Sequence, residues 1–283
     1  MRIDLHTHTS VSDGTDTPTQ LVRKAAEQGL DVIGLTDHDT FDGLREAGLA
    51  AQSAGIGVLP GMEMSCQLDG ASVHLLGYGC DPHNEALLDE LARVRVGRTG
   101  RLPEMLAKLA ELGMPLTEAE ISAQVGSSPS LGRPHVADAM VAKGYVRDRQ
   151  EAFDRYLYEG GPAYANRYSC ALRRGIELIR RAHGVPVIAH PWARGRDKEL
   201  TPAVMSELAM EYRLEGVEVD HPDHDADTRA RLRPLAERLG LLQFGSSDYH
   251  GLGKLRNDLG CETTPDEVYD ELVRRIRSRG GNL

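Results

Sequence analysis

Asp4-Leu-His6-Thr-His8, followed by Ser12-Asp13-Gly14, is the stretch near the start of this 283-residue chain that decides its interpretation. Two histidines at positions i and i+2 of a β-strand point to the same face. Their neutral imidazoles can therefore bind one metal ion from one side. An isolated His-x-His is more often a pair of surface histidines, so the metal interpretation depends on what the rest of the chain adds.

The composition favours one large α/β domain, or one domain that carries an insertion. Hydrophobic residues make up 40% of the chain, and no apolar run approaches the ~18 residues of a membrane span. The four cysteines show no Cys-x-x-Cys spacing, and the first strand begins too early for a signal peptide. A net charge of −10 argues against a broad nucleic-acid-binding face. We therefore expect a cytoplasmic protein without disulfides, without membrane association and without an extended nucleic-acid surface.

Short apolar runs rich in β-branched residues alternate with helical patterns along most of the chain. Strands are predicted at residues 2–6, 31–36, 57–59, 73–76, 186–189, 216–219 and 241–244. Helices are predicted at residues 17–29, 42–54, 171–183, 201–213, 225–239 and 265–277. Strands that alternate with helices indicate a parallel sheet. Because no Gly-rich phosphate loop follows the first strand, a closed or nearly closed barrel is favoured over a Rossmann sheet.

Residues 84–165 break this alternation, because they contain helical patterns only, with breaks at Gly126–Pro129 and Gly160–Pro162. A loop that leaves the carboxyl end of a barrel strand emerges at the barrel mouth. We therefore predict that residues 1–83 and 166–283 form the barrel. Residues 84–165 are then a small helical insertion that caps the substrate site.

Residues of metal-ligating type follow the predicted strands, mostly at their ends. They are His6, His8, Asp13, His38, Glu63, His74, His190, Asp248 and His250. The carboxyl ends of parallel barrel strands meet at one face, so these side chains are expected to converge there. Nitrogen and oxygen ligands without sulfur suit Mn²⁺, Zn²⁺ or Fe²⁺, and the size of the set predicts two or three ions. The three carboxylates leave such a pocket positive, which suits a phosphate ester. Asp37 and Asp39 are expected to orient the His38 ring.

These residues lie in motifs that resemble the PHP (polymerase and histidinol phosphatase) family of metal-dependent phosphoesterases. The motifs are Asp4-Leu-His-Thr-His8, Ser12-Asp-Gly14, Leu35-Thr-Asp-His-Asp39, Gly61-x-Glu63, Ala189-His-Pro191 and Ser247-Asp-x-His250. The resemblance implies a distorted (β/α)7 TIM-like barrel. It also implies one ion on His6, His8 and Asp248, a second on His74 and His190 with Glu63 bridging, and a third on Asp13, His38 and His250, with Mn²⁺ the first choice. A metal-bridging hydroxide would attack phosphorus, with Asp248, His190 and Glu63 as the catalytic residues.

Arg133-Pro134-His135 resembles a motif of one PHP branch, which includes nucleotide 3′,5′-bisphosphate phosphatases and a related 5′-to-3′ exoribonuclease. Arg133 can clamp a second phosphate bidentately. The remaining candidates for substrate binding are His135, Arg194, Arg196 and His221. The expected substrate is a small phosphorylated compound, first the 3′-phosphate of a nucleoside 3′,5′-bisphosphate. Histidinol phosphate and short RNA are the alternatives, and a non-catalytic metal-binding module is a more distant one.

Arg95, Arg98 and Arg101 fall near one face of a predicted helix in the insertion. They could form a basic ridge that guides an oligonucleotide. A solvated helix face is the favoured interpretation of such spacing.

Overall fold

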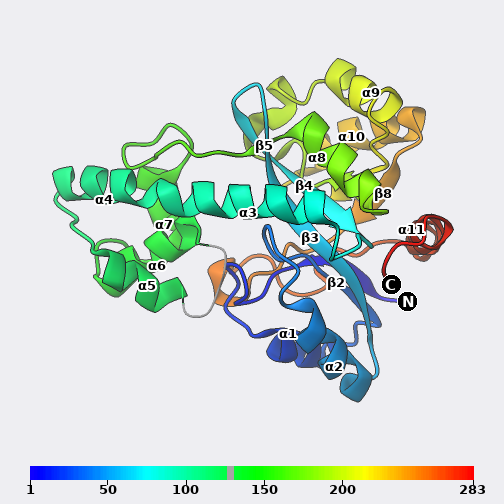
Figure 1. The fold of residues 1–283 in the computed structure, drawn as a ribbon, viewed down its shortest axis with the longest axis horizontal. Helices are drawn as coiled ribbons and strands as arrows, with labels where there is room; N and C mark the ends of the chain where they lie inside the picture. Colours follow the sequence, from blue (N-terminus) through cyan, green and yellow to red (C-terminus); the bar gives the residue numbers. More distant parts are fainter. Residues whose placement is uncertain (126–130) are drawn as a thin grey trace.

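The computed structural model describes residues 1–125 and 131–283, apart from the side chain of Arg194, and its strands form a mixed sheet nearly closed into a barrel (Figure 1). In order around the sheet the strands are β1 (Ile3–Thr7), β2 (Val32–Leu35), β3 (Gly57–Leu68), β4 (Ala71–Tyr78), β6 (Val185–Ile188), β7 (Gly216–Asp220) and β8 (Leu242–Gly245). A bridge between Thr7 and Tyr249 links the two ends of this order. The short β5 (Cys170–Ala171) pairs with β3 off this path. The predicted TIM-like α/β barrel is confirmed.

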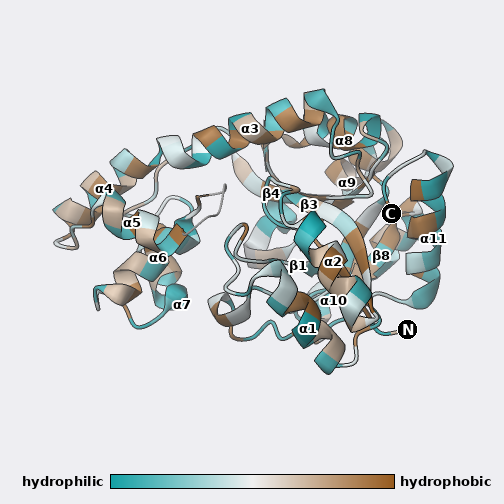
Figure 2. Cartoon of the chain, turned by 60° about the horizontal axis from the view of Figure 1, so that its bottom comes forward, coloured by the Kyte–Doolittle hydropathy of each residue, from teal (hydrophilic) through white to brown (hydrophobic). Residues whose placement is uncertain are grey.

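Helices surround the sheet where the sequence predicts them. They are α1 (Pro18–Glu27), α2 (Leu44–Ala54), α8 (Leu172–Arg181), α9 (Pro202–Met210), α10 (Ala226–Leu239) and α11 (Asp266–Ser278). The start of α1 is fixed by a capping box, in which Thr17 and Gln20 each accept the other's backbone N–H. The apolar faces of helices and strands pack together between the layers (Figure 2).

The direction of β4 corrects the prediction of a wholly parallel sheet. β3 continues past Glu63 to Leu68, and β4 then returns antiparallel to it; β4 is also antiparallel to β6. Asp69 and Gly70 make the turn with φ angles of 50° and 91°. Two successive residues with positive φ match the twist of the flanking strands in a tight hairpin. His74 therefore lies inside an antiparallel strand, paired with Ser65, and not at the carboxyl end of a parallel one.

Between β4 and β5 the described residues form helices and no strand. These elements are α3 (Glu85–Gly100), α4 (Leu102–Glu111), α5 (Glu118–Val125), α6 (Arg133–Ala142), α7 (Arg149–Ala152) and the π-helical turn η1 (Phe153–Leu157). The long α3 runs beside the barrel, and α4 to α7 lie together at one side of it (Figure 1). They share an apolar core that includes Leu109, Ile121 and Val136. The predicted break at Gly126–Pro129 lies outside the described residues.

Three arginines connect this helical segment to the loops after β1 and β2. Arg95 Nη1 donates to the backbone oxygen of Asp39 at 2.6 Å. Arg149 Nη1 donates to the backbone oxygen of Asp13 at 2.9 Å. Arg98 Nε donates to Asp39 Oδ2 at 2.7 Å. The helical segment therefore contacts the end of the barrel at which β1 and β2 terminate.

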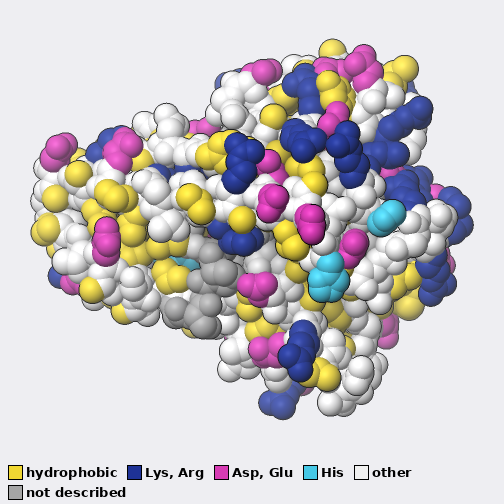
Figure 3. Space-filling model, viewed as in Figure 1, with side chains coloured by type: hydrophobic (Ala, Val, Ile, Leu, Met, Phe, Trp, Pro, Cys, Tyr) yellow, Lys and Arg dark blue, Asp and Glu magenta, His cyan; other side chains and the backbone are white. Residues whose placement is uncertain are grey.

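Basic side chains gather over α8 and α11 on the face drawn in Figure 3, with acidic side chains among them. Glu215 pairs with three of these arginines: Arg180, Arg275 and Arg279.

No helix within the described ranges combines the length and the apolar character that a membrane span needs.

Candidate metal centre

Glu63 lies at the centre of a buried cluster at the barrel mouth. Ring nitrogens of five histidines lie 2.9–3.4 Å from its two carboxylate oxygens: His6, His8, His38, His74 and His190. Glu63 follows the part of β3 that pairs with β2, where its side chain can meet histidines from both neighbouring strands. One carboxylate thus contacts donors from four separate segments of the chain, since His6 and His8 both belong to β1 and its end.

The remaining predicted ligands complete the cluster. Asp248 Oδ1 lies 3.5 Å from Nε2 of both His6 and His8, and His250 Nε2 lies 3.2 Å from Asp13 Oδ1. Within the described residues, three sets of side chains each bring their donor atoms within 4.8 Å of one another. The sets are His8, Asp13, His38 and His250; His6, His8 and Asp248; and His38, Glu63 and His74.

Two buried atoms in the cluster make no hydrogen bond to any residue that the structure describes. They are Asp248 Oδ1 and His38 Nδ1. A buried polar atom without a partner costs about 1–3 kcal/mol. Both atoms face other donors of the cluster, and oxygen and imidazole donors together suit divalent first-row ions. The residues present therefore fit a site for divalent metal ions.

The carboxylates of the cluster are held in their ionised form. Burial by itself raises the pKa of Glu63, but the charges of neighbouring histidines, His74 first among them, outweigh it and hold that pKa well below its usual range. The pKa values of Asp13 and Asp248 are lowered in the same way, by histidines around Asp13 and by Lys254 first around Asp248. Negative charge is therefore available to a cation at neutral pH.

The histidines divide into two groups. Burial lowers the pKa of His190 to about 3 and that of His250 to about 4, so both rings are neutral, which is the form that binds a metal. Burial opposes protonation of His8 as well, but the adjacent carboxylates of Asp248 and Glu63 raise its pKa to about 9. A bound metal ion competes with that proton.

Glu218, in β7, contacts two of the proposed ligands, and it is not among the site residues expected from the sequence. Its Oε1 lies 2.9 Å from His6 Nδ1, and its Oε2 accepts the backbone N–H of His190 at 2.7 Å. The Nδ1 hydrogen of His6 is thus engaged, which leaves the Nε2 lone pair directed at the cluster. The signal in the sequence was a glutamate inside the apolar run Gly216–Val219, where burial demands a partner.

Asp37 and Asp39 act differently from the expectation that they orient the His38 ring. Asp37 accepts hydrogen bonds from the backbone and hydroxyl of Thr9 at 2.8 and 2.6 Å. Asp39 accepts from the backbone of Ser65 at 2.7 Å and from Arg98. They therefore fix the backbone on each side of His38, because adjacent elements supply stronger donors than its ring.

Of the residues expected to bind substrate, His221 lies against the cluster. Its buried Nε2 is 3.4 Å from Asp248 Oδ2. Arg196 is half-buried, and its charge contributes to the lowered pKa of His74, after burial. The side chain of Arg194 lies outside the described residues.

The other two lie at the start of α6. His135 is buried, and its Nδ1 accepts the backbone N–H of Gly132 at 3.0 Å. Arg133 Nη1 donates to the backbone oxygen of Leu157 at 2.9 Å, and its guanidinium lies 5.3 Å from the Tyr164 ring. Both side chains are thus held by the helical segment.

Arg98 and Arg101 contradict the expectation of a solvated helix face. They are only 4% and 5% exposed, whereas Arg93 on the same helix α3 is well exposed. The start of α6 adjoins this face at Arg98, and Tyr168, before β5, lies against Gly97 of α3. Neither neighbour can be predicted from the spacing of the arginines.

Comparison with known proteins agrees with this geometry. Residues 4–94 match the model of the PHP domain. A 3′,5′-nucleoside bisphosphate phosphatase from Chromobacterium violaceum is 33% identical over 280 residues, which is 98% of this chain and 97% of that protein. The chain belongs to the PHP family.

Further relatives of this PHP chain lie in the predicted branch. A 5′-3′ exoribonuclease from Haemophilus influenzae is 31% identical over 88% of the chain and 90% of its own length. A solved structure from Bifidobacterium adolescentis, described as a metal-dependent phosphoesterase, has a TM-score of 0.91 at 35% identity and covers 96% of both chains. The PHP chain is a hydrolase that acts on phosphoester bonds and binds divalent metal ions.

Proposed function

We propose that this PHP enzyme removes the 3′-phosphate from a nucleoside 3′,5′-bisphosphate. The proposal depends on the position of Arg133 in the helical segment that contacts the barrel mouth. Gly132, just before it, adjoins Arg98: a Cβ on Gly132 would lie 3.1 Å from Arg98 Nη1. Arg98 in turn binds Asp39, next to His38. A substrate whose scissile phosphate lies at the cluster can thus present a second phosphate to arginines. The bisphosphate phosphatase among the relatives supports the same substrate class.

We assign the ions as the family resemblance implies, and the close approach of the donor atoms in the cluster supports this assignment. One ion is assigned to His6, His8 and Asp248, a second to His74 and His190 with Glu63 bridging, and a third to Asp13, His38 and His250. Mn²⁺ is our first choice, and Zn²⁺ and Fe²⁺ suit the same donors. When bound, such ions lower the pKa of water and stabilise charge on phosphate oxygens.

The protein supplies positioned protons around this centre. His221 Nδ1 accepts the backbone N–H of Asp223 at 3.0 Å, so its hydrogen is on Nε2, which faces Asp248. His221 thereby holds Asp248, whose other oxygen can receive the proton of the attacking water. His190 Nε2 lies 3.3 Å from Glu63 Oε1, so these two proposed catalytic residues also position each other.

The ring hydrogen of His135 can be located in the same way as that of His221. Because its Nδ1 accepts a backbone N–H, its hydrogen is on Nε2 and can be donated to a phosphate oxygen. We propose that residues 84–165 form a domain that caps the substrate site, and that Arg133 and His135 are its contacts with the substrate. Arg194 and Arg196, which follow β6, remain proposals for substrate binding.

A second candidate is stepwise 5′-to-3′ hydrolysis of short RNA, which the exoribonuclease relative supports. The test is release of phosphate with Mn²⁺ from adenosine 3′,5′-bisphosphate, AMP and histidinol phosphate, with a 5′-phosphorylated RNA dinucleotide assayed for cleavage. We expect the bisphosphate to give the highest kcat/KM, and a chelator to abolish turnover. Preference for histidinol phosphate would overturn the proposal, and preference for the dinucleotide would select the second candidate.

Arg133→Ala separates the role of the second phosphate from general damage. We expect kcat/KM for the bisphosphate to fall on the order of tenfold or more, since a charge-assisted hydrogen bond is lost. We expect kcat/KM for adenosine 3′-monophosphate, which lacks the second phosphate, to change little. Equal loss on both substrates would show that Arg133 does not contact the second phosphate.

A further inference from the structure

Four arginines converge between the helical segment and the barrel. Arg98 and Arg101 lie at the end of α3, Arg133 begins α6, and Arg167 precedes β5. Arg98 and Arg101 are buried, and Arg133 and Arg167 are half-buried. These four residues are called the arginine pocket below. Arg133 belongs to a sequence motif, and Arg98 contacts the loop after β2. Among the described contacts, Arg101 and Arg167 have neither role.

The positive charge of the arginine pocket is poorly balanced. Asp39 pairs with Arg98, and the described residues provide no ion pair for Arg101 or Arg167. The buried Nε of Arg101 has no hydrogen-bond partner in the part of the chain that the structure describes. Arg167 Nη1 donates to the backbone oxygen of Tyr168 at 3.2 Å. A buried guanidinium without an acceptor is unfavourable unless a ligand completes it.

Electrostatics point the same way. Burial lowers the pKa of the Arg101 guanidinium well below its usual range, and the positive charges of three neighbouring arginines lower it further. Burial also lowers the pKa of Arg167, to about 10. The N-terminus of the ten-residue helix α6 adds backbone N–H groups and the positive end of its dipole beside Arg98.

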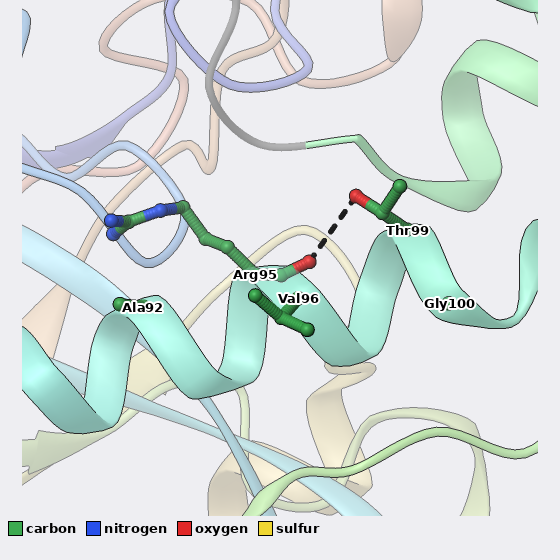
Figure 4. Close-up of a pocket in the computed structure, with 5 residues that line it drawn as sticks. All are labelled: Ala92, Arg95, Val96, Thr99 and Gly100. Atoms are coloured by element: carbon green, nitrogen blue, oxygen red, sulfur yellow. Dashed lines mark hydrogen bonds between the residues drawn. The ribbon is translucent and has the colours of Figure 1, made fainter.

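The outward side of α3 is separate from the arginine pocket. A shallow groove there is lined by Ala92, Arg95, Val96, Thr99 and Gly100 (Figure 4). The Arg95 side chain extends away from the groove, and its Nη1 donates to the backbone oxygen of Asp39 at 2.6 Å. Arg95 is therefore already engaged with the loop after β2, and the unbalanced charge lies on the inner side of α3.

We infer that Arg101 and Arg167, together with Arg98 and Arg133, bind the phosphate group of the substrate that is not hydrolysed. This inference rests on the proposed function, in which that group is the 5′-phosphate of the nucleotide. An anion in the arginine pocket gives Arg101 Nε an acceptor and offsets the repulsion among the guanidinium groups. Arg98 links the arginine pocket to the metal centre. It adjoins the start of α6, and it donates a hydrogen bond to Asp39, which follows His38.

The binding test uses chelator-treated enzyme, so that metal ions hold no phosphate. AMP, adenosine and inorganic phosphate are titrated calorimetrically into the wild type, Arg101→Gln, Arg167→Gln and the exposed control Arg93→Gln. We expect the wild type and Arg93→Gln to bind AMP more tightly than adenosine. Each pocket variant should weaken AMP on the order of tenfold and leave adenosine unchanged. Equal affinity of the wild type for AMP and adenosine, or unchanged AMP binding in both pocket variants, would overturn the inference.

Stability gives a second readout. Arg101→Gln removes a charge from a like-charged cluster, so its Tm in phosphate-free buffer should equal or exceed that of the wild type. Added inorganic phosphate should raise the Tm of the wild type more than that of either variant. A lower Tm of both variants without phosphate, and an equal response to it, would identify structural arginines.

The inference and the proposed function can fail separately. Arginine-dependent AMP binding without turnover of the bisphosphate would support the arginine pocket and reject the bisphosphatase. Turnover of the bisphosphate with kcat/KM unchanged in both pocket variants would support the bisphosphatase and reject the arginine pocket.

Discussion

At the scale of single residues, the account depends on Glu63. Its two oxygens contact five histidines from four segments, and the charges of neighbouring histidines, His74 first, hold its pKa low. A carboxylate in that position can bridge ions that separate sets of imidazoles hold. Glu218 acts one contact further out, through the Nδ1 of His6 and the backbone of His190.

Glu63→Ala should abolish phosphoesterase activity and lower the metal content of the purified protein, because two proposed ions lose a shared ligand. Metal per chain is measured by plasma mass spectrometry beside the activity assay. The exposed Glu27→Gln serves as the matched control and should keep both values. Normal metal content in Glu63→Ala would remove the bridging role.

Glu218→Gln should weaken metal binding by roughly 10–100-fold, the usual effect of removing a carboxylate behind a ligating histidine. The amide can still accept from the His190 backbone but no longer favours the Nδ1–H form of His6. Competition with a fluorescent chelator measures the affinity. An unchanged affinity, with the fold intact by circular dichroism, would show that Glu218 is only a packing residue.

The sequence predicted much of this site because its ligands follow strands that are themselves recognisable. It could not predict the burial of Arg98 and Arg101, since the surfaces that cover them come from α6 and the segment before β5. The contacts of Asp37 and Asp39 were likewise hidden, because Thr9 and Ser65 approach them from other strands.

At the scale of elements, the β3–β4 hairpin is the main departure from a regular parallel barrel. It carries Glu63 and His74 on adjacent antiparallel strands. His74 Nδ1 lies 2.9 Å from Glu63 Oε1. A cue for it was present in the sequence, since Asp69-Gly70 between two apolar runs is a strong hairpin signal. The regular alternation of the other strands with helices concealed it, and β3 was predicted too short.

Gly70→Ala should lower the free energy of unfolding by about 1 kcal/mol, because Gly70 has a φ of 91° that residues with a Cβ disfavour. Gly48→Ala is the matched control: Gly48 lies within α2, a Cβ there meets nothing within 4 Å, and we expect stabilisation of about 0.5–1 kcal/mol. Denaturant unfolding measures both. Loss of stability in Gly48→Ala as well would discredit the turn argument.

At the scale of the whole molecule, the barrel mouth unites the N-terminal strand, the hairpin, β6 and the loop after β8 around one buried charge cluster. The helical segment contacts this mouth through Arg98 and Arg149. Ions at the cluster would thus link segments that are remote in sequence, so metal binding should contribute to global stability.

Removal of metal should lower the Tm, and readdition of Mn²⁺ should restore it. A ligand at about 100 times its Kd stabilises a folded protein by about 2.7 kcal/mol per site. Differential scanning calorimetry with and without chelator makes the measurement. A Tm that is independent of metal would show that the cluster does not bind ions tightly in the folded protein.

The most direct test of the central claim is phosphate release from adenosine 3′,5′-bisphosphate, measured as a function of Mn²⁺ bound per chain. The structure of the cluster predicts no turnover in chelated protein and activity that requires at least two ions per chain. Full activity in chelated protein, or saturation at one ion per chain, would contradict a multi-ion phosphoesterase centre built around Glu63.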